Sequence, residues 1–486
     1  MKLKIKENVK IAIVTFLIAT ILGIYIGHAL TPTTTFTISP GVYPGAPDYT
    51  IWKEGSNYFA KNANGEIEFS GTDATTVIQQ AINITHNAGG GTVLIKNGIY
   101  YPTDAIRMKS NVHLRGESRD GTILKVADGT PDNWGGLHVI ITYYDSSGAL
   151  GTNITISDLT VDTNLLGIDY TVVPIRISTN NKFVRIINVK IPSYDGYNSA
   201  AISLSNGQFG EIRDCIILNG GIEGGTNCEA IYVSNYTEYK IINNVIYDSP
   251  REGIYIGETC ADYGEIRGNH IYHCDSEGID LRSNFTVVAG NTFYNCSNGI
   301  WVSSAGNTIS GNVFYGGTNC IVVSGSSRPA YYNSITGNIF AGYTSQAIAV
   351  EDVIHGISIV GNVVRNTGAS YVFRLSEVQN FTITGNMING TTSASAVTVS
   401  NCKYGIVSGN MITDANQGIY IGNSTYITVS SCIVLQSVSY GFRETGSSDY
   451  NIIIGCTFKG SGTADIVTIG SNTHVHLCWN GTSWIS

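Results

Sequence analysis

A six-residue phrase, Ile-x-Gly-Asn-x-Ile/Phe, recurs along most of this chain at intervals of about 24 residues. Clear copies occupy Ile266–Ile271, Ile309–Phe314, Ile335–Phe340, Ile383–Ile388 and Val407–Ile412. In degenerate copies the fourth position is Leu159, Val189, Cys215, Asn244, Asn291, Asn362, Cys432 or Cys456. Repetition at a period of about 20 to 50 residues indicates that one structural unit is stacked many times.

Each period also contains a second phrase, x-Gly-Ile-x-Ile/Val, as at residues 252–256, 277–281, 298–302 and 417–421. Both phrases alternate apolar residues with others, which is typical of strands that bury one face. A period of about 24 residues is too short for a propeller blade, but it fits three short strands and three bends. The sequence therefore predicts an all-β parallel β-helix, with about 13 coils between residues 150 and 470.

The fourth position of the first phrase holds Asn in most coils and Leu, Val or Cys in the others. A position that exchanges Asn for apolar residues is expected to point inward. Stacked Asn side chains at a bend can hydrogen-bond to one another and to the backbone. We therefore interpret this column as structural and assign it no chemistry.

The region before the repeats predicts a cap for the open end of the stack. Thr72 or Asp73 can cap a helix over residues 72–88 that places its apolar side chains on one face. Such a helix would cover an exposed β-edge, which otherwise invites aggregation. We expect one β-helix domain over residues 49–486, with a C-terminal cap at residues 471–486.

The helix and the stretch at residues 89–124 (GGGTVLIKNGIYYPTDAIRMKSNVHLRGESRDGTIL) resemble the opening of the pectate-lyase-like superfamily. The resemblance covers residues 72 to about 465, and it implies a right-handed, single-stranded parallel β-helix. That superfamily contains polysaccharide hydrolases, lyases, epimerases and phage tailspikes. One scaffold hosts many chemistries, so the activity must be argued from the site.

The N-terminus predicts export. Four lysines, Lys2, Lys4, Lys6 and Lys10, precede an uncharged apolar run at residues 11–30. Such a run can span a bilayer, and the lysines orient it with the N-terminus in the cytoplasm. We expect residues 1–30 to be a signal anchor or a signal peptide, and the Thr/Pro-rich residues 31–48 to be a stalk. The body would then be membrane-anchored on the extracytoplasmic face, or secreted if the segment is cleaved.

Charge is concentrated in a few coils. Residues 211–282 contain 13 Asp/Glu and 5 Lys/Arg, whereas residues 283–350 contain Arg328 as their single charged side chain. A merely solvated surface would not require such polarisation along a regular array. The acidic field argues against nucleic acid as a partner.

The repeat register places three of these acids in one column. The residue before Gly/Ala-Ile is Glu229, Glu252 and Glu277 in consecutive coils, and then Asn298. Neighbouring coils lie about 4.8 Å apart, so the three carboxylates should repel one another. Either one carboxyl keeps its proton, or a cation such as Ca²⁺ binds among Glu229, Glu252 and Glu277. In a third interpretation the side chains splay into solvent and Arg251 and Arg282 neutralise them.

The outward position just after the Ile carries aromatic residues on the same coils. Tyr232, Tyr255 and Trp301 occupy it, with Asp280 between them. Aromatic side chains on consecutive coils can form a platform on which sugar rings stack. We expect these three residues to bind a polysaccharide or cell-surface glycan together with Arg251, Arg282 and Asn298, unless a long loop covers the aromatic residues.

The layout is similar to that of the polygalacturonase-like hydrolases of this superfamily. Glu252 and Glu277 lie where that family has its first Asp motif and its Asp-Asp pair. Asn298 replaces the His of a Gly-His-Gly motif, and Cys320-Ile321 stands in place of an Arg-Ile-Lys motif. The resemblance implies that paired carboxylates cleave a glycosidic bond. We expect Glu277 as acid and Glu252 as base, with Glu229 or Asp280 assisting.

Two alternatives remain open. The first is a Ca²⁺-dependent lyase or epimerase, for which Arg251, Arg282, His270 or His273 would supply the basic group. Residues 248–252 (Asp-Ser-Pro-Arg-Glu) resemble the Asp-Pro-His-Glu motif of alginate epimerases, but they lack the His and are interrupted. The second is a non-catalytic surface protein that binds glycans. Its support is the predicted anchor and the missing cationic motif.

Overall fold

A computed structural model describes residues 46–130, 138–164, 172–194, 200–221, 228–257, 262–352, 355–365 and 370–485. The predicted segment at residues 1–30 lies outside the described residues, as does the predicted stalk apart from residues 46–48. Within the described ranges, no helix is both long enough and apolar enough to cross a membrane.

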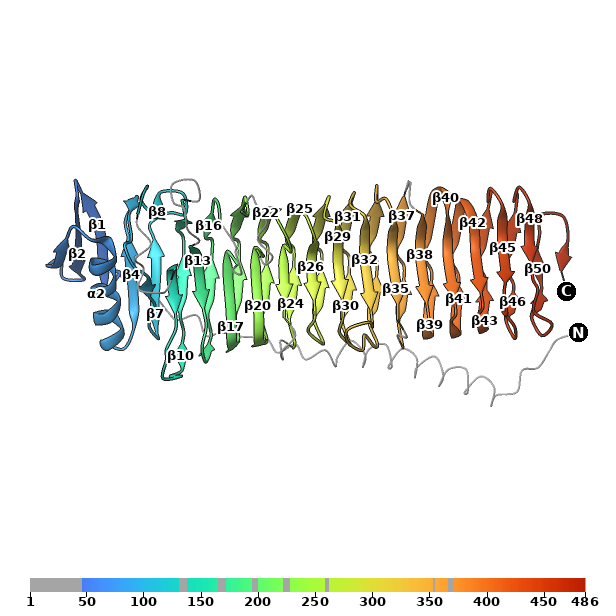
Figure 1. Ribbon diagram of the computed structural model, residues 1–486, viewed down its shortest axis with the longest axis horizontal. Coiled ribbons are helices and arrows are strands. Elements are labelled where there is room, and N and C mark those ends of the chain that lie inside the picture. The colour runs from blue at the N-terminus through green and yellow to red at the C-terminus, as the bar shows by residue number, and fades with distance from the viewer. Residues whose placement is uncertain are drawn as a thin grey trace, which may run out of the picture. The chain divides into compact units, whose positions relative to one another are not determined.

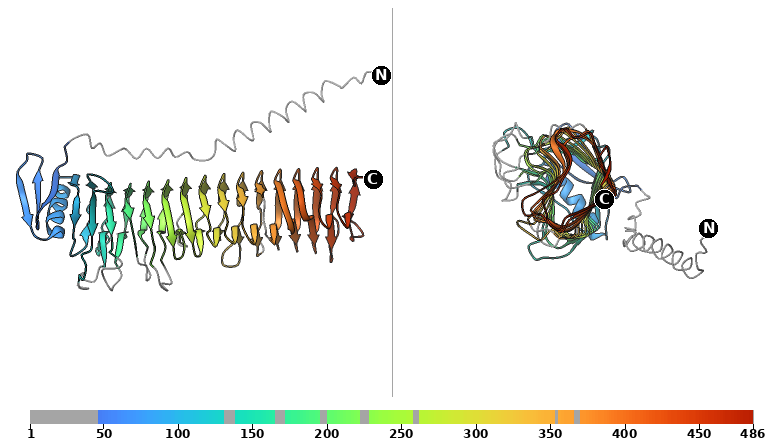
Figure 2. Two further views of the ribbon diagram at one scale, coloured as in Figure 1. Left: turned by 90° about the horizontal axis from the view of Figure 1, so that it is seen from above. Right: turned by 90° about the vertical axis from the view of Figure 1, so that its right-hand side faces the viewer.

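Residues 46–485 form a long stack of coils whose strands run parallel (Figure 1). The strands belong to a 19-stranded and a 32-stranded sheet, and strands of successive coils pair in register. Viewed along the stack, the coils superimpose around one interior (Figure 2). The predicted all-β parallel β-helix is confirmed, and it has about 15 turns in all. The early coils on β4 (Gly91–Ile95) and β7 (Val112–Gly116) lie before residue 150, so they add to the 13 coils predicted between residues 150 and 470.

The N-terminal end is covered by the expected helix. Helix α2 (Ala74–Asn87) begins after Asp73, whose side chain accepts hydrogen bonds from the first free backbone N–H groups. Its buried face includes Val77, Ile78 and Ala81. Strands β1 (Tyr49–Glu54), β2 (Asn57–Asn62) and β3 (Ile67–Gly71) form an antiparallel edge that joins the stack through the parallel pair β1–β4.

The C-terminal end has only strands. Strand β49 (His474–His476) continues the stack by pairing in parallel with β46 (Ile452–Ile454). Strands β50 (Cys478–Trp479) and β51 (Trp484–Ile485) then close the described chain as a short antiparallel pair.

The Asn column lies inside the stack, as predicted. It consists of eight consecutive buried side chains: Asn244, Asn269, Asn291, Asn312, Asn338, Asn362, Asn386 and Asn410. Asn338 is representative, because its Nδ2 donates to Asn362 Oδ1 and to the Ile309 carbonyl, each at 3.0 Å. Its Oδ1 accepts from the backbone and side-chain N–H groups of Asn312 at 2.9 and 3.0 Å. Every buried polar atom of this amide is therefore paired.

Four neighbouring strands of the larger sheet carry the predicted site. They are β20 (Ile231–Thr237), β23 (Ile254–Ile256), β26 (Glu277–Leu281) and β29 (Asn298–Val302). Their inward residues Ile231, Ile254, Ile279 and Ile300 pair in register and are buried. This apolar row fixes which residues of each strand face outward.

Candidate functional site

The predicted register of the glutamate column is observed. The Ala230 N–H donates to the Glu252 carbonyl at 3.1 Å, and the Gly253 N–H donates to the Glu277 carbonyl at 2.9 Å. Glu277 then pairs with Asn298 across β26 and β29. The three glutamates therefore occupy the same position in three consecutive coils, at the start of β26 and two residues before β20 and β23.

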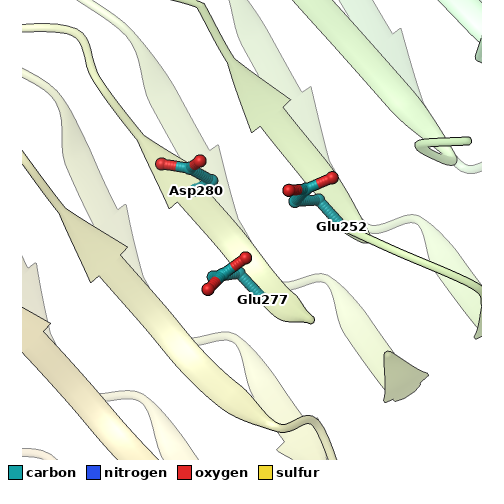
Figure 3. A group of neighbouring side chains, drawn as sticks. All are labelled: Glu252, Glu277 and Asp280. Atoms are coloured by element: carbon teal, nitrogen blue, oxygen red, sulfur yellow. The ribbon is translucent and has the colours of Figure 1, made fainter. Parts of the chain in front are cut away.

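Three carboxylates gather at one point of this column. Glu252, Glu277 and Asp280 each offer an oxygen, and these oxygens lie within 4.8 Å of one another. Figure 3 shows Glu252 facing the other two side chains across the gap between neighbouring strands. Glu252 and Asp280 are buried, whereas Glu277 is partly exposed. We call these three residues the acid cluster.

Two arginines flank the acid cluster. Arg251 Nε lies 3.1 Å from Glu252 Oε1, and its Nη1 lies 3.7 Å from Glu229 Oε1. Arg282 donates from both Nε and Nη2 to Asp280, with its shortest contact at 2.8 Å. Glu229, Glu252 and Asp280 thus share two cations, as in the third interpretation, but all three are buried rather than splayed into solvent.

Glu277 is held by neutral donors instead of a cation. The Ser276 hydroxyl donates to its Oε2, and Asn298 Nδ2 donates to its Oε1 at 3.0 Å. Asn319 Nδ2 in turn donates to Asn298 Oδ1 at 2.9 Å. This chain of amides fixes the orientation of the most accessible carboxylate in the acid cluster.

Burial dominates the electrostatics of the other acids. It raises the pKa of Glu252 to about 7. Arg251 lowers this pKa, whereas Glu229 and Glu277 raise it further. Burial likewise raises the pKa of Glu229 and that of Asp280, although Arg251 and Arg282 oppose it. Glu252 Oε2 is also buried without a hydrogen-bond partner among the described residues. A protonated Glu252 could donate a hydrogen bond from this oxygen.

The predicted aromatic platform is partly built. The rings of Tyr232 and Tyr255 stack with centroids 5.3 Å apart and planes at 5°. The Arg282 guanidinium lies 5.0 Å from the Tyr255 ring centroid, so it covers part of that ring. Trp301 pairs in register with Asp280 and is partly exposed. Residues 222–227 and 258–261 of the neighbouring loops lie outside the described residues.

A second aromatic row on the same coils was missed from the sequence. Tyr247, Tyr272, Tyr294 and Tyr315 pair in register on the strands that precede the glutamate column. Adjacent rings lie 5.8 and 6.2 Å apart for the first two pairs. The signal was present, because a Tyr follows the Asn phrase in each of these coils. Beside this row, His273 Nδ1 lies 3.1 Å from Asp248 Oδ1.

Two of the three predicted calcium ligands lie together, and Asp280 takes the place of the third, Glu229. Glu252 and Glu277 meet Asp280 in the acid cluster, while Glu229 contacts Arg251. Carboxylate oxygens are the ligands that Ca²⁺ prefers, and the buried, unpartnered Glu252 Oε2 would gain a partner from a cation. The residues present therefore fit a calcium ion.

Two family models match the chain. Residues 173–340 match a right-handed β-helix region, and residues 333–484 match the periplasmic copper-binding protein NosD. The chain is a right-handed parallel β-helix. The fold implied by the resemblance to the pectate-lyase-like superfamily is thereby confirmed. A tailspike protein mutant of E. coli bacteriophage HK620, solved with a pentasaccharide, shares this fold at a TM-score of 0.51 and 14% identity, covering 77% of this chain and 74% of that one.

Curated relatives match parts of this β-helix. Mannuronan C5-epimerase AlgE3 of Azotobacter vinelandii is 28% identical over 218 residues, which is 41% of this chain and 11% of the epimerase. Alginate lyase 7 of the same organism is 35% identical over 100 residues, 19% of this chain and 11% of the lyase. Iota-carrageenase of Alteromonas macleodii is 35% identical over 99 residues, 20% of either chain. The chain thus spans a fifth or less of these three relatives.

Proposed function

We propose that this β-helix acts on a polysaccharide at the acid cluster, and that it hydrolyses glycosidic bonds. One observation carries the proposal: a buried carboxyl, Glu252, has a pKa of about 7 and lies within 4.8 Å of the partly exposed carboxylate of Glu277. A proton donor beside a base is the pair that glycoside hydrolysis requires. The similarity to an epimerase, a lyase and a carrageenase supports a polysaccharide as the substrate.

The environment of each carboxyl assigns its role. Glu252 retains its proton up to about pH 7, so it is the proton donor to the leaving glycosidic oxygen. Glu277, oriented by Ser276 and Asn298, is the carboxylate that meets the anomeric carbon or its attacking water. These roles are the reverse of those expected from the sequence. The short distance between the two carboxyls favours products that retain the anomeric configuration.

The remaining predicted residues would bind the sugar chain around these two groups. Tyr232, Tyr255 and Trp301 offer aromatic surface next to the acid cluster, and Asn298 lies one coil beyond Glu277. Arg251 and Arg282 hold Glu252 and Asp280 in place. In this proposal Glu229 and Asp280 assist by fixing the two arginines.

The test is a polysaccharide panel that includes alginate, mannuronan and iota-carrageenan. Hydrolysis releases reducing ends without unsaturated products, and Glu252→Gln and Glu277→Gln should each abolish this release. Glu265→Gln is the matched control, since Glu265 belongs to an ion pair on the smaller sheet. Glycan binding that persists in both variants, with no turnover by the wild-type protein, would identify a non-catalytic glycan-binding protein instead.

A second candidate is a calcium-dependent epimerase or lyase. The fit of Glu252, Glu277 and Asp280 to a calcium ion favours it, as does the similarity to mannuronan epimerases and an alginate lyase. The bound ion would neutralise a uronate carboxylate, His273 would be the residue that takes the C5 proton, and Arg251 would stay a cation that binds the carboxylates. Unsaturated ends measured by ultraviolet absorbance, or inverted C5 centres measured by NMR, both lost on chelation, would establish this candidate over hydrolysis.

The predicted export and membrane attachment remain part of the proposal. A polysaccharide-acting β-helix on the extracytoplasmic face would meet its substrate directly. Fractionation of cells that express the full chain would test this, because an anchored protein sediments with membranes and a cleaved one is secreted.

A further inference from the structure

One corner of the stack carries an exposed aromatic ladder far from the acid cluster. Tyr404, Tyr426 and Tyr450 occupy the same position in three consecutive coils, the first two within β41 (Lys403–Ser408) and β43 (Thr425–Ser430) and the third just before β46. Their rings stack with centroids 5.3 Å apart in both pairs and planes at 17° and 14°. The three side chains are 54%, 49% and 50% exposed. We call these three residues the tyrosine ladder.

The backbone at these positions is unfavourable for tyrosine. All three residues have left-handed φ values, of 58°, 60° and 57°. Bulky residues rarely adopt this conformation, whereas Gly and Asn adopt it readily. Gly306, Gly356 and Asn380 occupy the same corner in other coils, and aromatic residues occupy it in several more, namely Phe183, Phe209, Tyr263, Phe285 and Tyr332. Backbone strain of this kind concentrates at functional sites, and among the described coils only the tyrosine ladder places three aromatic residues in a row at this corner.

The surroundings indicate what the ladder can recognise. Lys403 and Asp449 flank it with opposite charges. The geometry repeats that of Tyr232 and Tyr255 at the acid cluster, where the ring centroids are also 5.3 Å apart. This spacing is close to the length of one sugar unit in an extended polysaccharide. Exposed tyrosines combine apolar ring surface with a hydroxyl, which suits sugar rings.

We propose that the tyrosine ladder is a second binding site for the polysaccharide on which the acid cluster acts. This inference rests on the proposed function for the identity of its ligand. Phe285 occupies the same corner in the coil of Asp280, and five coil steps separate it from Tyr404. At 4.8 Å per coil the two sites are about 24 Å apart along the stack. A long polymer can reach both sites at once, whereas a short oligosaccharide occupies only one.

Occupying both sites raises the affinity for long polymers specifically. Binding at the acid cluster holds the polymer near the ladder at a high effective concentration. The ladder therefore increases the affinity for polymers without changing the turnover of short substrates.

The test compares long polymer with tetrasaccharide of the same composition, using alginate, mannuronan and iota-carrageenan. The triple variant Tyr404→Asn, Tyr426→Asn, Tyr450→Asn suits the left-handed backbone, as Asn380 shows, so it should fold. We expect its dissociation constant for polymer, measured by affinity electrophoresis or calorimetry, to rise at least about tenfold. Its turnover of tetrasaccharide should be unchanged. Tyr426→Phe is the control that keeps the ring, and it should bind like the wild-type protein.

Two results would overturn the inference. One is unchanged polymer affinity in the triple variant. The other is a triple variant that binds polymer like the wild-type protein but no longer self-associates in sedimentation. That result would make the ladder an interface between copies of this chain. Binding is measured without turnover, so an inactive protein whose polymer affinity depends on the ladder would refute the proposed function alone.

Discussion

Two columns of polar side chains run along this β-helix, one inside and one on the surface of the same coils. In the inner column each Asn amide both donates and accepts, so Asn312, Asn338 and Asn362 satisfy one another. In the outer column Glu229, Glu252 and Glu277 can only accept when ionised. Stacking therefore stabilises the amides, whereas stacked carboxylates repel one another.

A reactive group can therefore arise in such a repeat where stacked side chains cannot satisfy one another's hydrogen bonds. The outer column returns to amides at Asn298 and Asn319, which donate along the column toward Glu277. Glu252 instead keeps a buried, unpartnered oxygen and a pKa of about 7. An unpaired buried acid is costly for stability, and this is the condition under which it holds a proton for catalysis.

The largest effect is expected when an acid of the acid cluster is replaced by an amide. Glu252→Gln removes the proposed proton donor, so we expect kcat for polysaccharide hydrolysis to fall by about 10² to 10⁴. The melting temperature should not fall, because the substitution removes a buried acid. Turnover and calorimetry on the same sample check both effects, and an active Glu252→Gln protein would contradict the assigned role.

The reverse exchange puts an acid into the amide column. Asn338→Asp loses the donors to Asn362 and Ile309 and buries a carboxylate inside the stack. We expect the free energy of unfolding to fall by about 3 kcal/mol, since donors are lost and a charge is buried. Asn389→Asp is the matched control on an exposed position, and a loss of similar size there would refute this explanation.

The pH dependence of stability should come from the outer column. Folding raises the pKa of Glu252 from 4.5 to about 7, so the folded state binds the proton more tightly than the unfolded state. Stability should therefore fall by about 1 to 3 kcal/mol as pH rises from 4.5 to 7, and then level off. Denaturation at a series of pH values measures this slope, and Glu252→Gln should flatten it. Activity should also decline above about pH 7.

The smallest expected effect concerns the aromatic platform. Trp301→Ala removes ring surface beside Asp280 and leaves the three carboxylates of the acid cluster unchanged. We expect substrate affinity to weaken by about 1 kcal/mol with kcat almost unchanged. Val322→Ala, one coil further along the same outward position, is the control. Equal KM values for the two variants would show that Trp301 does not contact the sugar chain.

The fold could be predicted because its information is local and repeated. Spacing alone placed the Asn side chains inside and aligned Glu229, Glu252 and Glu277, since one register governs every coil. Helix α2 was also predictable, because a cap residue and an apolar face lie within one short segment. The early coils on β4 and β7 do not carry the phrase, and they lie before the range in which coils were counted.

The site was less predictable because it depends on how side chains turn after the backbone is set. Nothing in the spacing shows that Asp280 replaces Glu229 beside Glu252 and Glu277, or that Arg282 covers Tyr255. The roles of the two glutamates depend on burial, which sequence alone does not measure. The tyrosine ladder was overlooked because its residues lie outside the two phrases that we tracked.

The Asn ladder also makes this molecule adjustable in whole steps of length. Each amide bonds only to its neighbours, so removal of residues 313–338 would bring Asn312 against Asn362 and restore an unbroken ladder. The acid cluster and the tyrosine ladder would then lie one coil step closer together, while each site kept its own contacts. Gain or loss of coils between Phe285 and Tyr404 is therefore a route by which such a protein could match its span to the polymer that it holds.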